Sequence, residues 1–337
     1  NGGDLWIQGT NDPKVYVHEF GHIYGLGHSN FWKTTSTNET SAVGTGTEEE
    51  YGDIYDVMGS GDLPRGHFHS QAKQKLNWLT ADQWKDAPSA GSAVYRIYRQ
   101  DSALTTGALR GVRISKRLPG GESEYYWIGY RPAYADNPYM MKGAYLLWQR
   151  PASVNSGEKC CLIDTTPLTV GIKTDAGLHI GRTYSDSSAR VHVTPLSTGG
   201  VGEDQYLDVQ IYTGTLTSST NLSLTLSGTS AIQARTTATF SLESDLGDQV
   251  VPAYFWDAGD GVVSGGTGNG ASTFTHAWTT GGTYTLSVTL SDMRGGARTV
   301  TKTVRVTDPV QDFVRRTPPA ADDILAIAAS PHLLVAV

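Results

Sequence analysis

The sequence has little cysteine, no long apolar run and no excess of basic charge. Its 26 Lys and Arg are outnumbered by 33 Asp and Glu, which gives a formal net charge of -7. Phosphate backbones therefore have no electrostatic reason to bind, and no nucleic-acid partner is expected. No apolar run reaches the roughly 18 residues that span a bilayer, and the longest candidate, at the C-terminus, is interrupted by Pro331 and His332. We expect a soluble protein without a membrane span.

The only two cysteines, Cys160 and Cys161, are neighbours in the chain. Their Cα atoms are about 3.8 Å apart across a trans peptide, which is shorter than the usual span of a disulfide. In a strand their side chains would also point to opposite faces. Two unbridged thiols are therefore expected.

Two helices are predicted near the N-terminus. The first covers Val15 to Gly25, because Asp12 can cap its start, Pro13 suits its first turn and Gly25 should end it. The second lies in the segment HFHSQAKQKLNWL, where the apolar residues recur at steps of four, four and three and so share one face. Those residues are Phe68, Ala72, Leu76 and Leu79.

From about residue 90 the sequence changes to short alternating segments such as AVYRIYR, EYYWIGY and GAYLLWQ. Apolar and polar residues alternate in these segments, and Gly, Pro, Asn and Asp residues bound them. This pattern predicts β-strands. The pattern ends near YLDVQIYTG, and after a Thr/Ser-rich joint at 213–220 further strands follow with the spacing of a small sandwich. Residues 308–320 suggest a linker, and the chain ends in two possible strands. Its length alone favours two to four domains.

Three histidines and a glutamate occur within the stretch VHEFGHIYGLGHSN. Residues four apart in a helix lie about 40° apart around the axis and about 6 Å along it, so His18 and His22 share a face. Glu19 is rotated by about 100° from His18 and can face a metal without binding it. His28 can join them only if the helix breaks, and Gly25 can adopt the positive φ at which helices commonly end.

Three neutral imidazoles would leave one position of a tetrahedral zinc ion open to water, as in catalytic sites. Zinc lowers the pKa of that water toward 7, and Glu19 can take its proton as the water attacks a carbonyl. The sequence thus predicts a Zn²⁺ site with His18, His22 and His28 as ligands and Glu19 as general base. The alternative is a chance scatter of histidines. The added glycine and third histidine make chance matches rarer than a bare H-E-x-x-H by on the order of several hundred-fold.

The pattern H-E-x-x-H-x-x-G-x-x-H, which begins at His18, resembles the zinc signature of the metzincin metallopeptidases. That family carries a downstream Met-turn beneath the metal, and YGDIYDVMGS matches it at Met58. EYGDIYDVMG followed by FHSQAKQKLNWL looks most like the gametolysin-like branch. The resemblance implies that Met58 forms an apolar floor under the zinc, and an ordinary core methionine is the alternative.

Some metzincins carry a further zinc-binding tyrosine two residues after the Met, but this chain has Ser60 there. No tyrosine switch is therefore expected. Ser29, after the third histidine, also differs from the acidic residue of the astacin-like and adamalysin-like branches. The family places about a hundred residues of twisted sheet before the zinc helix, with an edge strand for substrate, whereas only NGGDLWIQGTNDPK precedes it here. We expect that the upstream half of the catalytic domain, with any signal or propeptide, is missing.

Residues 221–307 resemble a polycystic-kidney-disease-type (PKD) domain, through YFWDAGDG and FTHAWTTGGTYTLSVTLSD. Asp257 and Asp260 would stabilise a turn. Segment 90–215 resembles the β-rich extension that follows the zinc domain in gametolysin-like bacterial proteins, and DDILAIAASPHLLVAV resembles the opening of a propeller blade. The PKD resemblance implies that four aromatic and histidine residues belong to the core or turns rather than to a site: Trp256, His276, Trp278 and Tyr284.

Other polar clusters have simpler expected roles. His67 and His69 are expected to cap or decorate the second helix rather than face a cleft. An acidic run lacks the ligand spacing of a known calcium loop and is expected to be a solvated loop. It consists of Glu48, Glu49, Glu50 and Asp53.

These patterns predict a multidomain, mainly β chain with an α+β remnant of a metzincin catalytic domain, comprising zinc helix, Met-turn and C-terminal helix. The expected parts are 1–88, the catalytic remnant; 89–215, a β-rich domain; 221–307, a PKD-type sandwich; and 308–337, a linker and the start of a further β unit. The predicted function is a secreted zinc endopeptidase acting on a protein or peptide substrate, such as an extracellular or cell-wall protein. The alternative is an extracellular binding or adhesion protein whose β modules hold a surface polymer and whose zinc site is vestigial.

Overall fold

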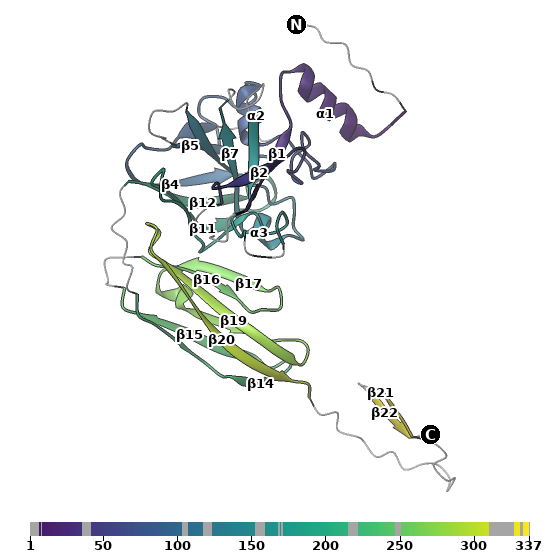
Figure 1. The fold of residues 1–337 in the computed structure, drawn as a ribbon, viewed down its shortest axis with the longest axis vertical. Coiled ribbons are helices and arrows are strands. Elements are labelled where there is room, and N and C mark those ends of the chain that lie inside the picture. The colour runs from purple at the N-terminus through teal and green to yellow at the C-terminus, as the bar shows by residue number, and fades with distance from the viewer. Residues whose placement is uncertain are drawn as a thin grey trace.

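The computed structural model contains two β-rich bodies and a short C-terminal hairpin (Figure 1). It describes residues 7, 9–35, 42–102, 107–116, 123–151, 159–167, 169, 171–214, 222–246, 251–309, 327–330 and 333–336. The mainly β architecture predicted from the sequence is confirmed. Across these residues, no helix combines the length and apolar character needed to cross a bilayer.

The N-terminal body contains an eight-stranded and a four-stranded sheet. The large sheet has the order β2-β1-β8-β7-β6-β5-β3, with β9 paired to β7, and the small sheet has the order β10-β11-β12-β4. The large sheet consists of β1 (Ser29–Thr34), β2 (Gly46–Glu49), β3 (Trp84–Asp86), β5 (Gly111–Lys116), β6 (Glu124–Gly129), β7 (Gly143–Arg150), β8 (Lys159–Ile163) and β9 (Leu178–His179). The small sheet consists of β4 (Gly91–Tyr98), β10 (Tyr184–Asp186), β11 (Val191–Gly199) and β12 (Tyr206–Thr213), with a 3-10 turn η2 (Gly202–Asp204) before β12.

The two sheets pack face to face because apolar residues alternate along their strands. In β12, Leu207, Val209 and Ile211 are buried, while the residues between them are partly exposed. They belong to the same hydrophobic cluster as Val112 of β5 and Ile128 of β6. Full burial of such a side chain contributes about 1.5–3 kcal/mol, so this cluster holds the two sheets together.

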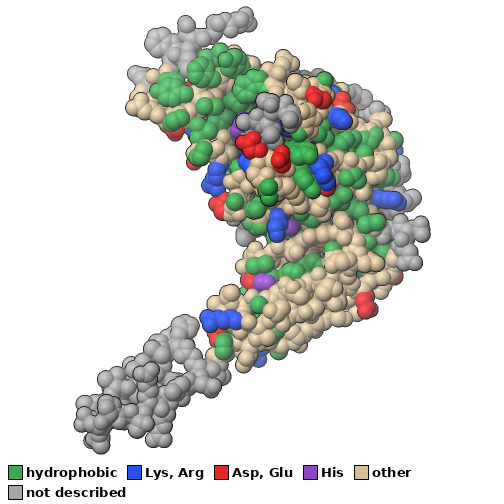
Figure 2. All heavy atoms as spheres, turned by 180° about the vertical axis from the view of Figure 1, so that it is seen from behind, with side chains coloured by type: hydrophobic (Ala, Val, Ile, Leu, Met, Phe, Trp, Pro, Cys, Tyr) green, Lys and Arg blue, Asp and Glu red, His purple; other side chains and the backbone are tan. Residues whose placement is uncertain are grey.

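The helix α1 (Pro13–Ile23) carries the first two histidines, as predicted. Asp12 Oδ1 accepts a hydrogen bond from Lys14 N at 2.9 Å, and Pro13 occupies the first turn; such a cap contributes about 1 kcal/mol. Gly21 is its only buried residue. Phe20 and Tyr24 are exposed, and Figure 2 shows apolar side chains gathered at this end of the molecule. The helix is therefore held by its histidine-bearing face.

The predicted boundary between residues 88 and 89 does not separate two sheets. β1 pairs in parallel with β8, with Asn30 opposite Cys161, and antiparallel with β2. The segment that follows the histidines therefore lies inside the same sheet as β5 to β8. Pairing between strands far apart in sequence has no local signal, so periodicity could not reveal it. Cys160 and Cys161 are buried in β8 and form no disulfide, as predicted.

The second helix, α2 (Ser70–Lys75), is shorter than the apolar pattern suggested. His69 caps it, because His69 Nδ1 accepts a hydrogen bond from Ala72 N at 3.0 Å. The helix ends at Leu76, and Asn77 adopts a left-handed conformation with φ of 57°. The apolar positions beyond the helix are therefore set by a turn. The predicted capping role of His69 is confirmed.

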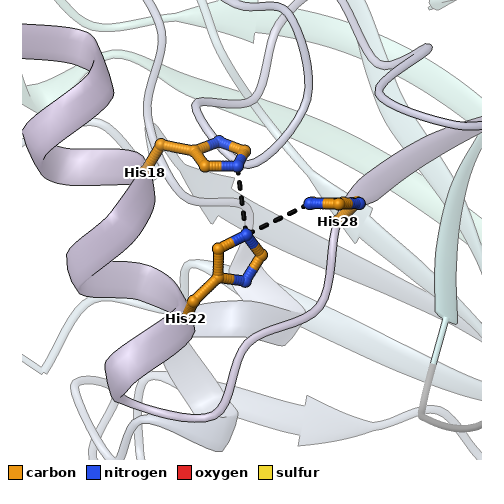
Figure 3. A group of neighbouring side chains, drawn as sticks. All are labelled: His18, His22 and His28. Atoms are coloured by element: carbon orange, nitrogen blue, oxygen red, sulfur yellow. Dashed lines mark hydrogen bonds between the residues drawn. The ribbon is translucent and has the colours of Figure 1, made fainter. Parts of the chain in front are cut away.

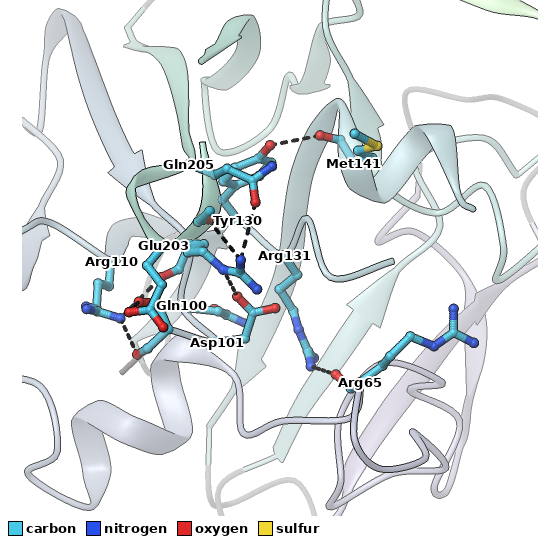
Figure 4. A network of polar contacts seen from close by, with 12 residues as sticks. Arg65, Gln100, Asp101, Arg110, Tyr130, Arg131, Met141, Glu203 and Gln205 are labelled. Atoms are coloured by element: carbon cyan, nitrogen blue, oxygen red, sulfur yellow. Dashed lines mark hydrogen bonds and ion pairs between the residues drawn. The ribbon is translucent and has the colours of Figure 1, made fainter. Parts of the chain in front are cut away.

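A buried polar network joins the segments around α2 to the large sheet (Figure 4). Lys73 of α2 donates a hydrogen bond to the backbone oxygen of Gln100, and burial lowers the Lys73 pKa to about 7. Arg131, which is fully buried, donates to the Arg65 oxygen at 3.0 Å. A short helix, α3 (Pro138–Met141), is tied in through Tyr130, whose hydroxyl donates to the Met141 oxygen at 2.9 Å. These contacts hold the segments of Arg65, Lys73 and Met141 against the loops that follow β4 and β6.

The C-terminal body is a sandwich of a three-stranded and a five-stranded sheet. The first contains β13 (Leu224–Ser227), β15 (Ala238–Ser244) and β18 (Thr273–His276). The second contains β14 (Ala231–Gln233), β16 (Ala253–Asp257), β17 (Val263–Thr267), β19 (Gly282–Ser291) and β20 (Ala297–Thr307), with a 3-10 turn η3 (Asn269–Ser272). The predicted sandwich is confirmed. Most of the predicted linker 308–320 lies outside the described residues, and β21 (Ile327–Ser330) pairs antiparallel with β22 (Leu333–Ala336).

The aromatic residues of this sandwich have the core and turn roles predicted for them. Trp256 and Trp278 are buried, and their indole N–H groups donate to the backbone oxygens of Ala271 and Ala258. Asp257 accepts a hydrogen bond from Gly259 N at 2.8 Å, and Asp260 accepts one from Val262 N at 3.1 Å. Asp260 also contacts His276 at 2.8 Å. Tyr284 stacks on Trp278 with ring centroids 5.6 Å apart.

The two bodies touch through closely packed backbone. A Cβ atom at Gly265 would lie 1.8 Å from the Ile180 oxygen, so only glycine allows this approach. The His179 ring packs against Phe255 with centroids 5.4 Å apart, and Ser291 Oγ donates to a hydroxyl of the N-terminal body at 2.7 Å. Figure 1 shows α1 at the opposite end of the N-terminal body. The sandwich is therefore docked away from the histidines.

Candidate metal centre

The three predicted ligands converge on one point (Figure 3). The Nε2 atom of His22 lies 3.1 Å from His18 Nε2 and 3.1 Å from His28 Nε2. Within the described part of the chain, this is the one group of three or more His, Cys, Asp or Glu side chains that lie close enough to share an ion. Gly25 has a φ of 86° and donates to the His22 oxygen at 2.9 Å. The chain therefore turns at Gly25, as predicted, and brings His28 back beside the helix.

The opposite nitrogen of each ring faces an oxygen acceptor. His18 Nδ1 lies 2.9 Å from the Val57 oxygen, and His22 Nδ1 lies 3.0 Å from the Leu26 oxygen. His28 Nδ1 lies 2.7 Å from a carboxylate oxygen of Glu50. A carbonyl or carboxylate oxygen accepts only, so each Nδ1 carries the hydrogen and each Nε2 presents a lone pair.

This arrangement fits a tetrahedral cation. Three lone pairs aimed at one point repel each other unless a positive ion lies between them. Zinc binds imidazole nitrogen at about 2.0–2.1 Å, which in a tetrahedron places neighbouring nitrogens about 3.3 Å apart. The two separations from His22 Nε2, both 3.1 Å, are close to that value, and the ligand atoms of all three histidines lie within 4.8 Å of one another. Burial is the largest cause that lowers the pKa of His18, and this favours the neutral, ligating form.

Glu19 lies next to the cluster without joining it. Burial lowers the pKa of His18 and raises the pKa of Tyr51; the charge of Glu19 opposes the first shift and adds to the second, so its carboxylate lies near both side chains. No hydrogen bond or ion pair from the described residues holds that carboxylate, and the residue is partly exposed. It is therefore available to accept a proton from a water molecule at the cluster.

Met58 lies buried against α1, the helix that carries His18 and His22. A Cβ atom at Gly21 would lie 2.2 Å from Met58 Sδ, so only glycine leaves room for the sulfur. Asp56 accepts a hydrogen bond from Met58 N at 2.7 Å, and Ser29 N donates to the Met58 oxygen at 3.0 Å. The turn is thus tied to the start of β1. Sequence reasoning missed Gly21, because its role depends on a side chain far along the chain.

Tyr51 also lies at the cluster, and sequence reasoning missed it. Its ring centroid is 3.8 Å from that of His28 and 5.8 Å from that of His18, and the residue is 43 % exposed. Its backbone has a φ of 59°, which is rare for a side chain of this size. Asn30 Oδ1 accepts the Tyr51 N–H at 3.1 Å and holds this conformation. The positive φ cannot be recognised from sequence in a non-glycine residue.

The acidic run is only in part the solvated loop that was expected. Glu50 contacts His28, and Glu48 accepts hydrogen bonds from Asn30 and from Arg150, the latter at 2.9 Å. Asp53 is fully buried, where it accepts a hydrogen bond from the Tyr145 hydroxyl. Glu49 and Glu50 are exposed, as expected of a solvated segment. The prediction was wrong for Glu48 and Asp53, which accept hydrogen bonds from side chains on β1 and β7.

The C-terminal sandwich also matches a known family. Residues 223–307 match the family model described as PKD domain. The chain contains a PKD domain. The match covers nearly the whole of the predicted range 221–307 and lies outside the histidine cluster. Figure 2 shows that the visible face of the PKD domain is mostly uncharged.

Two solved structures are similar to part of the chain. One is the PKD domain of an M14-like peptidase from Thermoplasmatales archaeon SCGC AB-540-F20, with 22% identity and a TM-score of 0.23, covering 25% of this chain and 91% of that one. The other is the PKD domain from the human VPS10 domain-containing receptor SorCS2, with 21% identity and a TM-score of 0.24, covering 33% of this chain and 91% of that one. No curated protein matches the chain.

Proposed function

We propose that this chain is a zinc-dependent endopeptidase of the metzincin type, similar to the gametolysin-like branch, that acts outside the cell. One observation carries the proposal: three Nε2 lone pairs converge while each Nδ1 is occupied by an oxygen acceptor. Structural zinc sites usually close with a fourth protein ligand, whereas three ligands leave a position for water. Among the residues that the structure describes, no fourth His, Cys, Asp or Glu joins the three histidines, which supports a catalytic role.

The proposed mechanism assigns the metal to His18, His22 and His28. Bound zinc would supply Lewis acidity toward a water molecule and toward the scissile carbonyl. Glu19 accepts a proton from the water as its oxygen bonds to the carbonyl carbon, and then donates that proton to the leaving amine nitrogen as the C–N bond breaks. Val57, Leu26 and Glu50 hold the imidazole rings in the required tautomer.

The surroundings of the cluster support a peptide substrate. Tyr51 presents a partly exposed ring beside His28, where it would pack on a bound peptide. Asn30 accepts a hydrogen bond from the Tyr51 N–H and donates one to Glu48, which Arg150 also contacts. This chain of hydrogen bonds holds Tyr51 in place. We infer that Tyr51 contacts the substrate and that the Met58 turn keeps the floor of the site rigid.

A second candidate function is an extracellular binding or adhesion protein, in which the PKD domain holds a surface polymer and the histidine site is vestigial. The family match to a PKD domain favours it. The retention of Glu19 beside three intact ligands favours the endopeptidase, because a binding protein has no need of a free carboxylate at that position.

Removal of zinc tests the proposal. The full-length protein with one equivalent of zinc is expected to cleave members of a fluorogenic peptide library. A zinc chelator should lower the rate by more than about 100-fold, because Lewis-acid stabilisation contributes several kcal/mol, and added zinc should restore it. Tight zinc binding without cleavage of any peptide would support the binding protein instead. Cleavage that persists after zinc removal would reject both the metal and the mechanism.

Substitution of Glu50 tests the support of the third ligand. Glu50→Gln is expected to weaken zinc binding by about 10-fold, because loss of a carboxylate partner of a ligating histidine typically costs 10–100-fold. Glu49→Gln is the matched control, since the neighbouring Glu49 contacts Lys173 rather than a histidine. Competition with a chromogenic zinc chelator measures both affinities. Equal affinities for the two variants would contradict the assigned contact.

A further inference from the structure

A second group of oxygen atoms lies in the loop between β8 and β9, outside the histidine cluster. Asp164 and Asp175 are 4% and 7% exposed, and Thr166 and Thr169 lie between them. Neither carboxylate forms an ion pair with any described residue. Arg182 lies close enough for its charge to lower the pKa of Asp164, but this single positive charge faces two buried carboxylates. The remaining negative charge is costly unless a proton or a cation neutralises it.

The oxygen atoms of this group lie at contact distance from one another. Thr166 Oγ1 is 3.1 Å from Asp164 Oδ1 and 3.1 Å from the Asp175 backbone oxygen. Thr169 Oγ1 is 2.9 Å from the Thr166 backbone oxygen and 3.3 Å from Thr166 Oγ1. It also contacts Asp175 Oδ2. The two carboxylates are thus linked through a continuous set of oxygens.

Hydrogen-bond donors are too few for this set. Each threonine hydroxyl has one hydrogen, yet Thr169 Oγ1 faces three oxygen atoms. Thr166 N donates to Asp164 Oδ1 at 2.8 Å. The Asp175 Oδ1 atom is buried and has no hydrogen-bond partner. Burial, reinforced by the charge of Asp175, raises the pKa of Asp164 to about 6. The charge of Arg182 opposes this shift only in part, so the group keeps net negative charge and an excess of lone pairs.

We propose that Asp164, Asp175 and the hydroxyl of Thr169 form a binding site for a divalent cation of the Ca²⁺ type. Ca²⁺ takes six to eight oxygen ligands at about 2.3–2.6 Å, so oxygens within its shell lie roughly 3 Å apart. The Thr166 backbone and hydroxyl oxygens lie 2.9 and 3.3 Å from Thr169 Oγ1, which is the spacing of further ligands in such a shell. The charge of Ca²⁺ balances the two carboxylates, and its irregular coordination suits hydroxyl and carbonyl ligands better than the strict octahedron of Mg²⁺ does.

The contacts of the loop between β8 and β9 indicate a structural role for the cation. The Tyr55 hydroxyl donates to the Lys173 oxygen at 2.9 Å, and Asn137 Nδ2 donates to the Thr174 oxygen at 2.6 Å. Tyr55 belongs to the segment that leads to Met58. A cation that fixes the loop therefore also braces the floor of the histidine cluster.

The site is tested on the zinc-saturated full-length protein, so that the histidines do not bind the added ion. Calcium at about 100 times its dissociation constant is expected to raise Tm by about 5–10 °C relative to EGTA. Terbium, which occupies calcium sites, should give luminescence sensitised by the nearby Tyr55, and calcium should displace it. A wild-type protein that shows neither the Tm shift nor displaceable luminescence overturns the proposal.

Asp175→Asn supplies an independent measurement. The variant is expected to lose the calcium-dependent Tm shift and to match or exceed the wild-type Tm in EGTA, because the amide relieves charge repulsion and adds a donor. Asp186→Asn is the control: Asp186 is also buried, but Lys116 lies 3.8 Å away and hydrogen-bond donors surround it. It should keep the calcium response. A calcium response retained by Asp175→Asn contradicts the assignment, and if that variant does not fold, the wild-type titration decides.

Discussion

Replacing Glu19 by Gln is expected to lower peptide turnover by about 10²–10⁴-fold, the usual contribution of a positioned general acid and base. Glutamine has nearly the same shape as glutamate but cannot accept a proton from water at neutral pH. Because the Glu19 carboxylate lies near His18 and no described residue forms a hydrogen bond or ion pair with it, its replacement should leave the histidine cluster unchanged. Turnover under saturating zinc measures the effect.

The control for this substitution is the zinc content. Glu19→Gln should bind one zinc ion per chain with wild-type affinity, since the glutamate is not a ligand. Glu49→Gln, which removes a carboxylate that contacts Lys173 away from the cluster, should keep wild-type turnover. Wild-type turnover in Glu19→Gln would rule out the assigned base. A loss of turnover together with a loss of zinc would instead mark Glu19 as a ligand.

Replacing His22 by Ala is expected to weaken zinc binding by more than about 100-fold. Loss of a hydrogen-bond partner of a ligating histidine typically costs 10–100-fold, and loss of the ligand itself should cost more. His22 is the central ligand, since its Nε2 is 3.1 Å from both other Nε2 atoms. Two imidazoles alone leave the cation with half of its tetrahedral ligands as water. Isothermal titration with zinc measures the change.

His276→Ala is the matched control for this experiment. His276 lies in the PKD domain and contacts Asp260, so its removal should leave zinc affinity unchanged. The PKD domain should also unfold at the same temperature in wild type and His22→Ala, because it is docked at the opposite end of the N-terminal body. A His22→Ala variant that binds zinc as tightly as wild type would contradict the shared site.

The features predicted correctly from sequence are those that depend on neighbours along the chain. Asp12 and Pro13 start α1, Gly25 turns the chain, and the spacing of the histidines places their rings together. Each follows from helix geometry and from the freedom of glycine at positive φ. The strands of the PKD domain were likewise predicted from alternation.

The features that sequence reasoning missed depend on contacts between distant segments. Glu50 supports His28, and Gly21 leaves space for Met58, but neither relation has a periodic signal. The parallel pairing of β1 with β8 joined two segments that had been assigned to separate domains. The oxygen group around Asp175 is another such case, because its members become a group only through the folding of one loop.

X-ray absorption at the zinc K-edge tests the central claim most directly. The protein loaded with one equivalent of zinc should show three imidazole nitrogens at about 2.0–2.1 Å and one exchangeable oxygen ligand. The imidazole signal should fall to two nitrogens in the His28→Ala variant. A spectrum with four protein ligands, or one in which the loss of His28 leaves the imidazole signal unchanged, would contradict an open catalytic zinc site held by these three histidines.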